Sequence, residues 1–200
     1  MNSSYQPQRA LDAARGALIE AMFGAGWLGW GLGEAKAFTG LVGPAFGSLE
    51  LLLVGCSIYA IREGRRLRRQ SPLVPASTRK SFLVVVLWEV LALALVSILA
   101  WRLHRWDLGS DWCAMVVGLH FLPLARVFRA PRLAVIGFVM TLWCVLCLVL
   151  FRSNTLVVSV TLGTGTLLWI GCVSALHRAR RIRQSLKSLP GAASPGMYIQ

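Results

Sequence analysis

The sequence predicts an all-α, polytopic membrane protein, a bundle of six transmembrane helices with both termini in the cytoplasm. Three observations predict this class. The 200 residues are 56% hydrophobic and 14% charged, with a mean hydropathy of +0.63, whereas soluble domains contain about a quarter charged residues. Six stretches approach the roughly 20 apolar residues that a helix needs to cross a bilayer. The basic residues are distributed unequally between the loops that join these stretches.

The six stretches form one transmembrane domain over residues 14–176, because no segment outside it is long enough for a second core. The predicted spans lie at about 14–33, 38–61, 81–101, 112–128, 133–151 and 155–176. The first two are rich in glycine, which membrane helices tolerate because it lets neighbouring helices approach closely. The fourth is the shortest. It contains Pro123, which removes a backbone donor and is expected to kink the helix.

The two ends of the chain are expected to be cytoplasmic. Residues 1–13 have no apolar core followed by a small-residue cleavage site, so we expect no cleaved signal peptide. Residues 177–200 form a basic tail, of which HRARRIRQSLK is able to continue the last span as an amphipathic helix. The final LPGAASPGMYIQ has the composition of a disordered segment. The tail is therefore predicted to be partly disordered.

The loop charges support this topology independently. Of the 21 Lys and Arg residues, seventeen fall on the side that holds both termini, and the other side holds Lys36, Arg102, Arg105 and Arg152. Such an excess marks the cytoplasmic side and requires an even number of spans. The protein is therefore expected in the inner (cytoplasmic) membrane of a bacterium.

The net charge of +13 would favour nucleic acid as the partner of a soluble protein, but no nucleic-acid-binding module is present. Here the basic clusters are expected to orient the chain and to contact anionic lipid headgroups. The residues concerned are Arg62, Arg65, Arg66, Arg68, Arg69, Arg178, Arg180, Arg181 and Arg183.

Four ionisable residues fall inside the predicted spans: Glu20, Glu50, Glu89 and His120. A charge at bilayer depth costs roughly 3 kcal/mol or more, so such groups usually face the protein interior and mark a pathway or a site. Glu50, Glu89 and His120 lie near the middle of their spans, and Glu20 is shallower. These four residues are the candidates for a polar cavity or a proton relay.

Helical spacing places two of the glutamates on faces of small residues. Glu20 shares a face with Gly16, Gly24 and Gly31, and Glu50 shares one with Gly43 and Gly47. Gly163 marks a similar surface in the last span. Small residues at this spacing are typical of helix–helix contacts in membranes. We therefore expect these glutamates to face protein, where they either line a cavity or hold helices together through hydrogen bonds.

No enzyme class is favoured, because the usual motifs of zinc proteases, serine hydrolases, P-loop proteins and dinucleotide-binding folds are absent. No cofactor and no metal site are predicted. The five cysteines lie in apolar surroundings. Cys144 and Cys147 are separated by two residues, as in a C-x-x-C motif, but they have no neighbouring charge that would activate a thiol. They are predicted to be core residues.

The block from Gly118 to Ala125, GLHFLPLA, resembles a G-x-H-F-x-P-x-A signature. This signature is similar to that of an uncharacterised family of small bacterial multi-pass membrane proteins. The resemblance implies that His120 and Pro123 belong to a shared kinked-helix element, and it implies no catalytic or binding role.

Two functions from different classes remain open on the sequence. One is a small transporter-like or channel-like protein with a polar cavity at the middle of the membrane. The alternative is a non-transporting membrane protein that assembles with a partner or with itself through its glycine faces. A third, an intramembrane enzyme that acts on lipid, would need a cavity that opens sideways beside His120.

Overall fold

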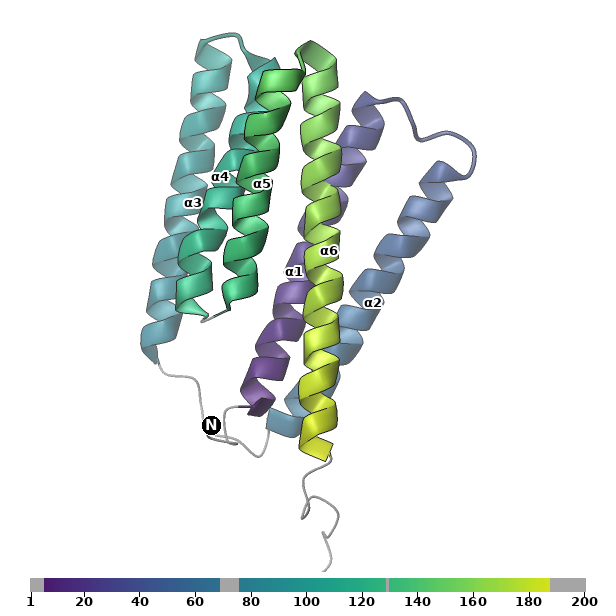
Figure 1. Cartoon of the computed structure of the whole chain (residues 1–200), viewed down its shortest axis with the longest axis vertical. Helices are drawn as coiled ribbons and strands as arrows, with labels where there is room; N and C mark the ends of the chain where they lie inside the picture. The colour runs from purple at the N-terminus through teal and green to yellow at the C-terminus, as the bar shows by residue number, and fades with distance from the viewer. Residues whose placement is uncertain (1–5, 69–75, 129, 188–200) are drawn as a thin grey trace, which may run out of the picture. The chain divides into compact units, whose positions relative to one another are not determined.

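The computed structural model of the chain describes residues 6–68, 76–128 and 130–187, which form six α-helices and no strand (Figure 1). The bounds of these helices are α1 (Gln6–Glu34), α2 (Val42–Arg68), α3 (Ala76–Arg102), α4 (Trp106–Val127), α5 (Pro131–Leu150) and α6 (Ser153–Lys187). The all-helical class expected from the sequence is confirmed.

Five of these helices are long and apolar enough to cross a membrane. The membrane-compatible segments are Val42–Arg66, Lys80–Arg102, Leu108–Val127, Pro131–Leu150 and Ser153–Leu186. This is compatible with a multi-pass membrane protein. The remaining helix, α1, has 29 residues but does not belong to that set. The count of six spans therefore depends on α1 and stays a prediction.

The helices differ from the predicted spans mainly at their ends. The second span was expected from residue 38, but α2 begins at Val42 because residues 38–41 form a turn closed by hydrogen bonds such as Val42 N to Thr39 O. At the other end of the chain, α6 continues beyond 176 to Lys187 through the segment that was expected to extend the last span. Residues 188–200, which include the segment predicted to be disordered, lie outside the described residues.

The start of α4 matters most for function. The fourth span was expected from residue 112, but α4 begins at Trp106 and so contains Ser110 and Asp111. At its other end the helix runs through Pro123 as far as Val127. This is possible because a proline in a membrane helix removes one hydrogen bond that neighbouring groups can compensate.

The chain folds into two compact units. One contains residues 1–22, 48–73 and 170–200, and the other contains residues 23–47 and 74–169. We call them the first unit and the second unit. The second unit holds all of α3, α4 and α5. The first unit is built from the N-terminal part of α1, most of α2 and the C-terminal part of α6.

In the second unit, α3, α4 and α5 lie side by side (Figure 1). Antiparallel neighbours pack in a regular register, in which each step toward the C-terminus of α4 matches a step toward the N-terminus of α5. Three buried clusters follow this register; they centre on Cys144 with Ala114, on Met140 with Val117, and on Leu133 with Leu124. Burying such side chains against neighbouring helices gives the unit its core.

A close helix contact in this unit joins α4 to α5. A Cβ atom built at Gly118 would lie 2.8 Å from Thr141 Oγ1 and 3.1 Å from the carbonyl oxygen of Gly137, and one built at Gly137 would collide with Gly118. The two backbones approach each other here because neither residue has a side chain. Such contacts between small residues supply much of the packing energy of membrane helices, where the hydrophobic effect does not drive association.

The first unit has an alanine-rich core. Ala10, Ala14, Ala17 and Ala21 are fully buried on one face of α1. Small side chains on this face let α2 approach, and a Cβ atom built at Gly64 would lie 3.2 Å from the Cα atom of Leu11. The α6 part of the unit contributes buried residues of similar size, Cys172, Ala175 and Ala179.

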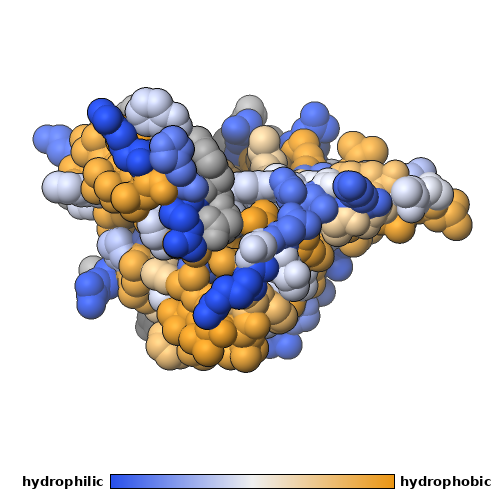
Figure 2. Space-filling view, turned by 90° about the horizontal axis from the view of Figure 1, so that it is seen from above, coloured by the Kyte–Doolittle hydropathy of each residue, from blue (hydrophilic) through white to orange (hydrophobic). Residues whose placement is uncertain are grey.

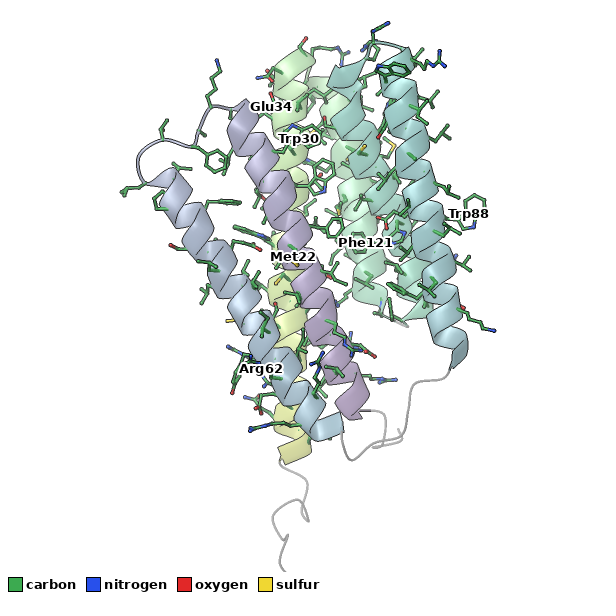
Figure 3. All side chains as sticks on the ribbon, turned by 180° about the vertical axis from the view of Figure 1, so that it is seen from behind. Met22, Trp30, Glu34, Arg62, Trp88 and Phe121 are labelled. Atoms are coloured by element: carbon green, nitrogen blue, oxygen red, sulfur yellow. The ribbon has the colours of Figure 1, made fainter. Side chains whose placement is uncertain are left out.

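Apolar side chains also cover much of the outer surface, as expected for helices surrounded by lipid. Hydrophobic residues are spread over the face seen in Figure 2, with hydrophilic residues between them. Trp88 on α3 is 68% exposed and points away from the neighbouring helices (Figure 3). In α3, none of the most apolar 18 residues is buried. This helix therefore presents an apolar surface suited to lipid.

Candidate functional site

Glu89 and His120 form a pair between α3 and α4. His120 Nε2 lies 3.2 Å from Glu89 Oε2, and the two side chains are 9% and 17% exposed, respectively. Both belong to the central parts of membrane-compatible segments, Lys80–Arg102 and Leu108–Val127. The sequence named both residues as candidates for a polar cavity or a proton relay, and the structure brings them into contact.

The register of α3 against α4 produces this pairing. Toward the other end of the hairpin, Ser97 forms a side-chain hydrogen bond with Cys113. Between these two polar pairs, Leu93 packs against the cluster that contains Val117. The α4 residues of both polar pairs are seven positions apart, which is two turns of a helix, so they lie on one face. Two polar pairs therefore lie along the α3–α4 interface, with an apolar contact between them.

The Glu89–His120 pair can hold a proton without a net buried charge. It is neutral when the carboxyl keeps its proton and the imidazole accepts the hydrogen bond, and it is also neutral overall as carboxylate with imidazolium. Interconversion of these forms moves a proton across one hydrogen bond. An acid–imidazole pair at bilayer depth is therefore equipped to bind, hold and release a proton. The ring of Phe121, 6.4 Å from that of His120 at 67°, gives the pair an apolar neighbour.

The other two predicted residues, Glu20 and Glu50, belong to the first unit. Glu20 is 2% exposed and Glu50 is half-buried. Both lie within electrostatic range of the Cys172 sulfur, which is 4.0 Å from the hydroxyl of Ser57. That hydroxyl donates a hydrogen bond of 2.8 Å to the carbonyl of Leu53. These groups form a second polar cluster, so the four predicted residues are divided between two units.

Asp111 is a buried carboxyl that was not among the predicted site residues. It is 0% exposed, and within the described part of the chain neither of its oxygens has a hydrogen-bond partner. It lies one turn before Ala114 on α4, and within electrostatic range of Cys144 and Cys147 on α5. In the sequence it lies one residue before the expected start of the fourth span at 112, so it falls outside the predicted spans. Leu108, Ala114 and Met115 are apolar residues on α4 that contribute to one core cluster. Their spacing would have predicted a helix that begins before Asp111.

The glycines predicted to pack helices have different surroundings. A Cβ atom built at Gly24 would meet the Trp169 ring, one at Gly31 would meet Leu162, and one at Gly163 would meet the Trp143 indole. At Gly43 the nearest atom is a Phe38 ring carbon at 3.7 Å, and at Gly47 no described atom lies within 4 Å. Gly16 is half-buried in α1.

The basic residues gather at one end of α2 and α6. Arg62, Arg65 and Arg66 are exposed on α2 (Figure 3 labels Arg62), and Arg66 pairs with Glu63 at 3.3 Å. On α6, Arg178, Arg180 and Arg181 are exposed and Arg183 is half-buried; of these, Arg180 and Arg183 border a groove. Arg68 is the last residue of α2, and Arg69 lies outside the described residues.

No metal site is found in the part of the chain that the structure describes, where no group of three or more His, Cys, Asp and Glu residues is arranged to hold an ion. Comparison with known proteins gives no relative: no protein-family model, no curated protein and no solved structure matches the chain.

Proposed function

We propose that this chain is a small transporter-like or channel-like protein of the bacterial inner membrane that holds and releases a proton at the Glu89–His120 pair. The observation that carries the proposal is the contact of 3.2 Å between these side chains near the middle of two membrane-compatible helices. Both termini would lie in the cytoplasm, and the basic ends of α2 and α6 would contact anionic headgroups. The relation to a family with the G-x-H-F-x-P-x-A block stays a prediction.

The chemistry of the pair supports a proton-handling role. A hydrogen bond that only fixes two helices can be made by an uncharged amide or hydroxyl, and such bonds stabilise membrane helices by about 1 kcal/mol. A carboxyl and an imidazole cost more to bury, and they add the ability to titrate. The amide substitution Glu89→Gln separates the two roles, because it can keep the hydrogen bond to His120 but cannot ionise.

The test measures proton flux. The full-length parent and the Glu89→Gln variant are reconstituted in vesicles that contain a pH-sensitive dye, and a potassium diffusion potential is applied. Flux is measured in buffer and again with a mixture of inorganic ions and small polar metabolites outside. We expect the parent to exceed protein-free vesicles in at least one condition, and Glu89→Gln to lose this excess.

The matched control is Glu63→Gln, which changes the same atoms at a carboxylate that pairs with Arg66 near the end of α2. It should keep the parent flux. Monodisperse elution and an unchanged unfolding temperature establish that each variant folds. A parent without flux in both conditions, or a Glu89→Gln variant with full flux, contradicts the proposal.

The second candidate is a non-transporting protein that works through helix packing and assembly. The close contact of Gly118 with Gly137 favours it, because this is the kind of contact that holds membrane helices together. It predicts that Glu89→Gln leaves both stability and function unchanged. The same variant therefore distinguishes the two functions.

A further inference from the structure

A groove of about 270 Å³ lies in the first unit, between α2 and α6. Its walls are mostly apolar, formed by Leu51, Leu52, Ala60 and Leu176. Leu51 and Leu52 are exposed in the structure, so in a membrane this side of the groove would face lipid chains. The volume is close to the lower end of ligand pockets, about 300 Å³, so the groove has room for part of a lipid molecule.

One end of the groove carries two cations, Arg180 and Arg183. They are three residues apart on α6 and so share one side of the helix. Neither forms an ion pair with a carboxylate in the described part of the chain. By the distribution of Lys and Arg between the loops, this end faces the cytoplasm.

The Arg183 side chain is oriented by an aromatic ring, but one of its hydrogen-bond donors has no acceptor among the described residues. Its guanidinium carbon lies 5.8 Å from the centre of the Tyr59 ring, a cation–π contact that orients the side chain across the groove. Its Nε atom is buried and donates no hydrogen bond to any described residue. A buried donor without an acceptor is costly, and the fork of a guanidinium matches the oxygens of a phosphate.

We propose that this groove binds one anionic phospholipid of the cytoplasmic leaflet. The phosphate lies between Arg180 and Arg183 and accepts hydrogen bonds from their terminal guanidinium nitrogens. The first part of one acyl chain lies along Leu51, Leu52 and Leu176, and the remainder continues into the bilayer. A soluble anion would leave the apolar wall unused, and a neutral lipid would leave the two cations without a counter-charge. The site is independent of the Glu89–His120 pair.

The test counts bound lipids on the full-length protein in detergent by native mass spectrometry. Phosphatidylglycerol is titrated against phosphatidylcholine with the same acyl chains. The parent should bind one phosphatidylglycerol with preference, and the double variant Arg180→Gln/Arg183→Gln should bind it at least about tenfold more weakly. This is the loss expected for removing charge-assisted hydrogen bonds.

The control is the double variant Arg178→Gln/Arg181→Gln. It removes the same charge from the same stretch of α6, but from exposed residues that do not border the groove, so binding should change by less than about twofold. Equal losses in both double variants, or equal binding of the two lipids by the parent, would overturn the proposal.

Gly55→Leu tests the acyl chain separately. Gly55 borders the groove, and a Cβ atom built there meets nothing within 4 Å, so leucine should fill the groove without disturbing the fold. We expect this variant to bind phosphatidylglycerol at least about tenfold more weakly at an unchanged unfolding temperature, since several apolar contacts are lost. If the arginine double variant does not fold, Gly55→Leu alone tests whether the groove binds the lipid. Unchanged binding in Gly55→Leu, with displacement of the lipid by inorganic phosphate, would show a site for a soluble anion and overturn the proposal.

Discussion

His120 Nε2 on α4 lies 3.2 Å from Glu89 Oε2 on α3, and the two residues are 31 positions apart in the chain. The contact depends on the register of the helical hairpin, because the same register joins Ser97 to Cys113 and places the Phe82 and Phe128 rings 5.7 Å apart. A shift of α4 by one residue would rotate His120 by about 100° away from its partner. The Glu89–His120 contact therefore forms only in this register of α4 against α3, and in turn it favours that register.

The first prediction concerns the energy of this pair. In a double-mutant cycle of Glu89→Leu and His120→Leu, we expect a coupling free energy of about 1 kcal/mol, in the range measured for hydrogen bonds between membrane helices. The losses of stability in the two single variants should add up to more than the loss in the double variant, because each single variant leaves one buried polar group without its partner. The measurement is the unfolding free energy in detergent.

The control cycle is Glu63→Leu with Arg66→Leu, an ion pair in which the arginine side chain is 83% exposed. Its coupling should be smaller, below about 0.5 kcal/mol. If the two cycles give the same coupling, the Glu89–His120 contact is not a buried hydrogen bond.

The second prediction concerns the α4–α5 contact. Gly118→Ala should lower the unfolding free energy by about 1–3 kcal/mol, because its methyl group would meet Thr141 Oγ1 and the Gly137 carbonyl. Gly26→Ala is the same change in a helix at a position where the added carbon meets nothing within 4 Å. It should be neutral or slightly stabilising, by up to about 1 kcal/mol. A Gly118→Ala variant as stable as Gly26→Ala would mean that the two backbones are further apart.

The third prediction concerns Asp111. Asp111→Ala should raise the unfolding temperature, because the substitution removes a fully buried carboxyl that has no partner among the described residues. An unsatisfied buried polar group costs about 1–3 kcal/mol. Asp12→Ala, at a residue whose side chain is 40% exposed and pairs with Arg15 at 3.8 Å, should change stability by less than about 0.5 kcal/mol. A large loss of stability in Asp111→Ala would show instead that the carboxyl has a working partner.

The fourth prediction concerns the topology of α1. Fusions of a reporter active only in the cytoplasm should be active at both termini and inactive in the loop at Lys36. This result requires α1 to cross the membrane, as the distribution of Lys and Arg between the loops predicts. If the N-terminal fusion is inactive and the C-terminal fusion is active, α1 does not cross and the number of spans is odd.

Much of the fold could be predicted from the sequence because each membrane helix is defined by a local property. Twenty consecutive apolar residues select a helix without reference to the rest of the chain, since every backbone group must be paired inside the membrane. The predicted span at 81–101 lies within one residue of the membrane-compatible segment Lys80–Arg102, and the span at 133–151 lies within two residues of Pro131–Leu150. The start of α4 was missed because Asp111 interrupts the apolar run, and apolarity was the signal used.

The pairing of site residues depends on tertiary contacts that have no local signal. Depth and helical face could be read for Glu50, Glu89 and His120, but these properties do not say which helices are neighbours. The structure pairs Glu89 with His120 and assigns Glu50 to the unit that also contains Glu20 and Cys172. It also reveals Asp111 and the groove beside Arg183, which arise from helix packing.

The sequence by itself determined that the chain forms apolar helices and that it contains costly ionisable groups within them, because both facts follow from composition along short segments. The tertiary structure decided which of these groups meet. The α3–α4 register brings Glu89 to His120, and the junction of α2 with α6 brings Tyr59 to Arg183. The physical reason is that polar contacts act over a few ångströms, so they depend on the register and rotation of each helix against its neighbour.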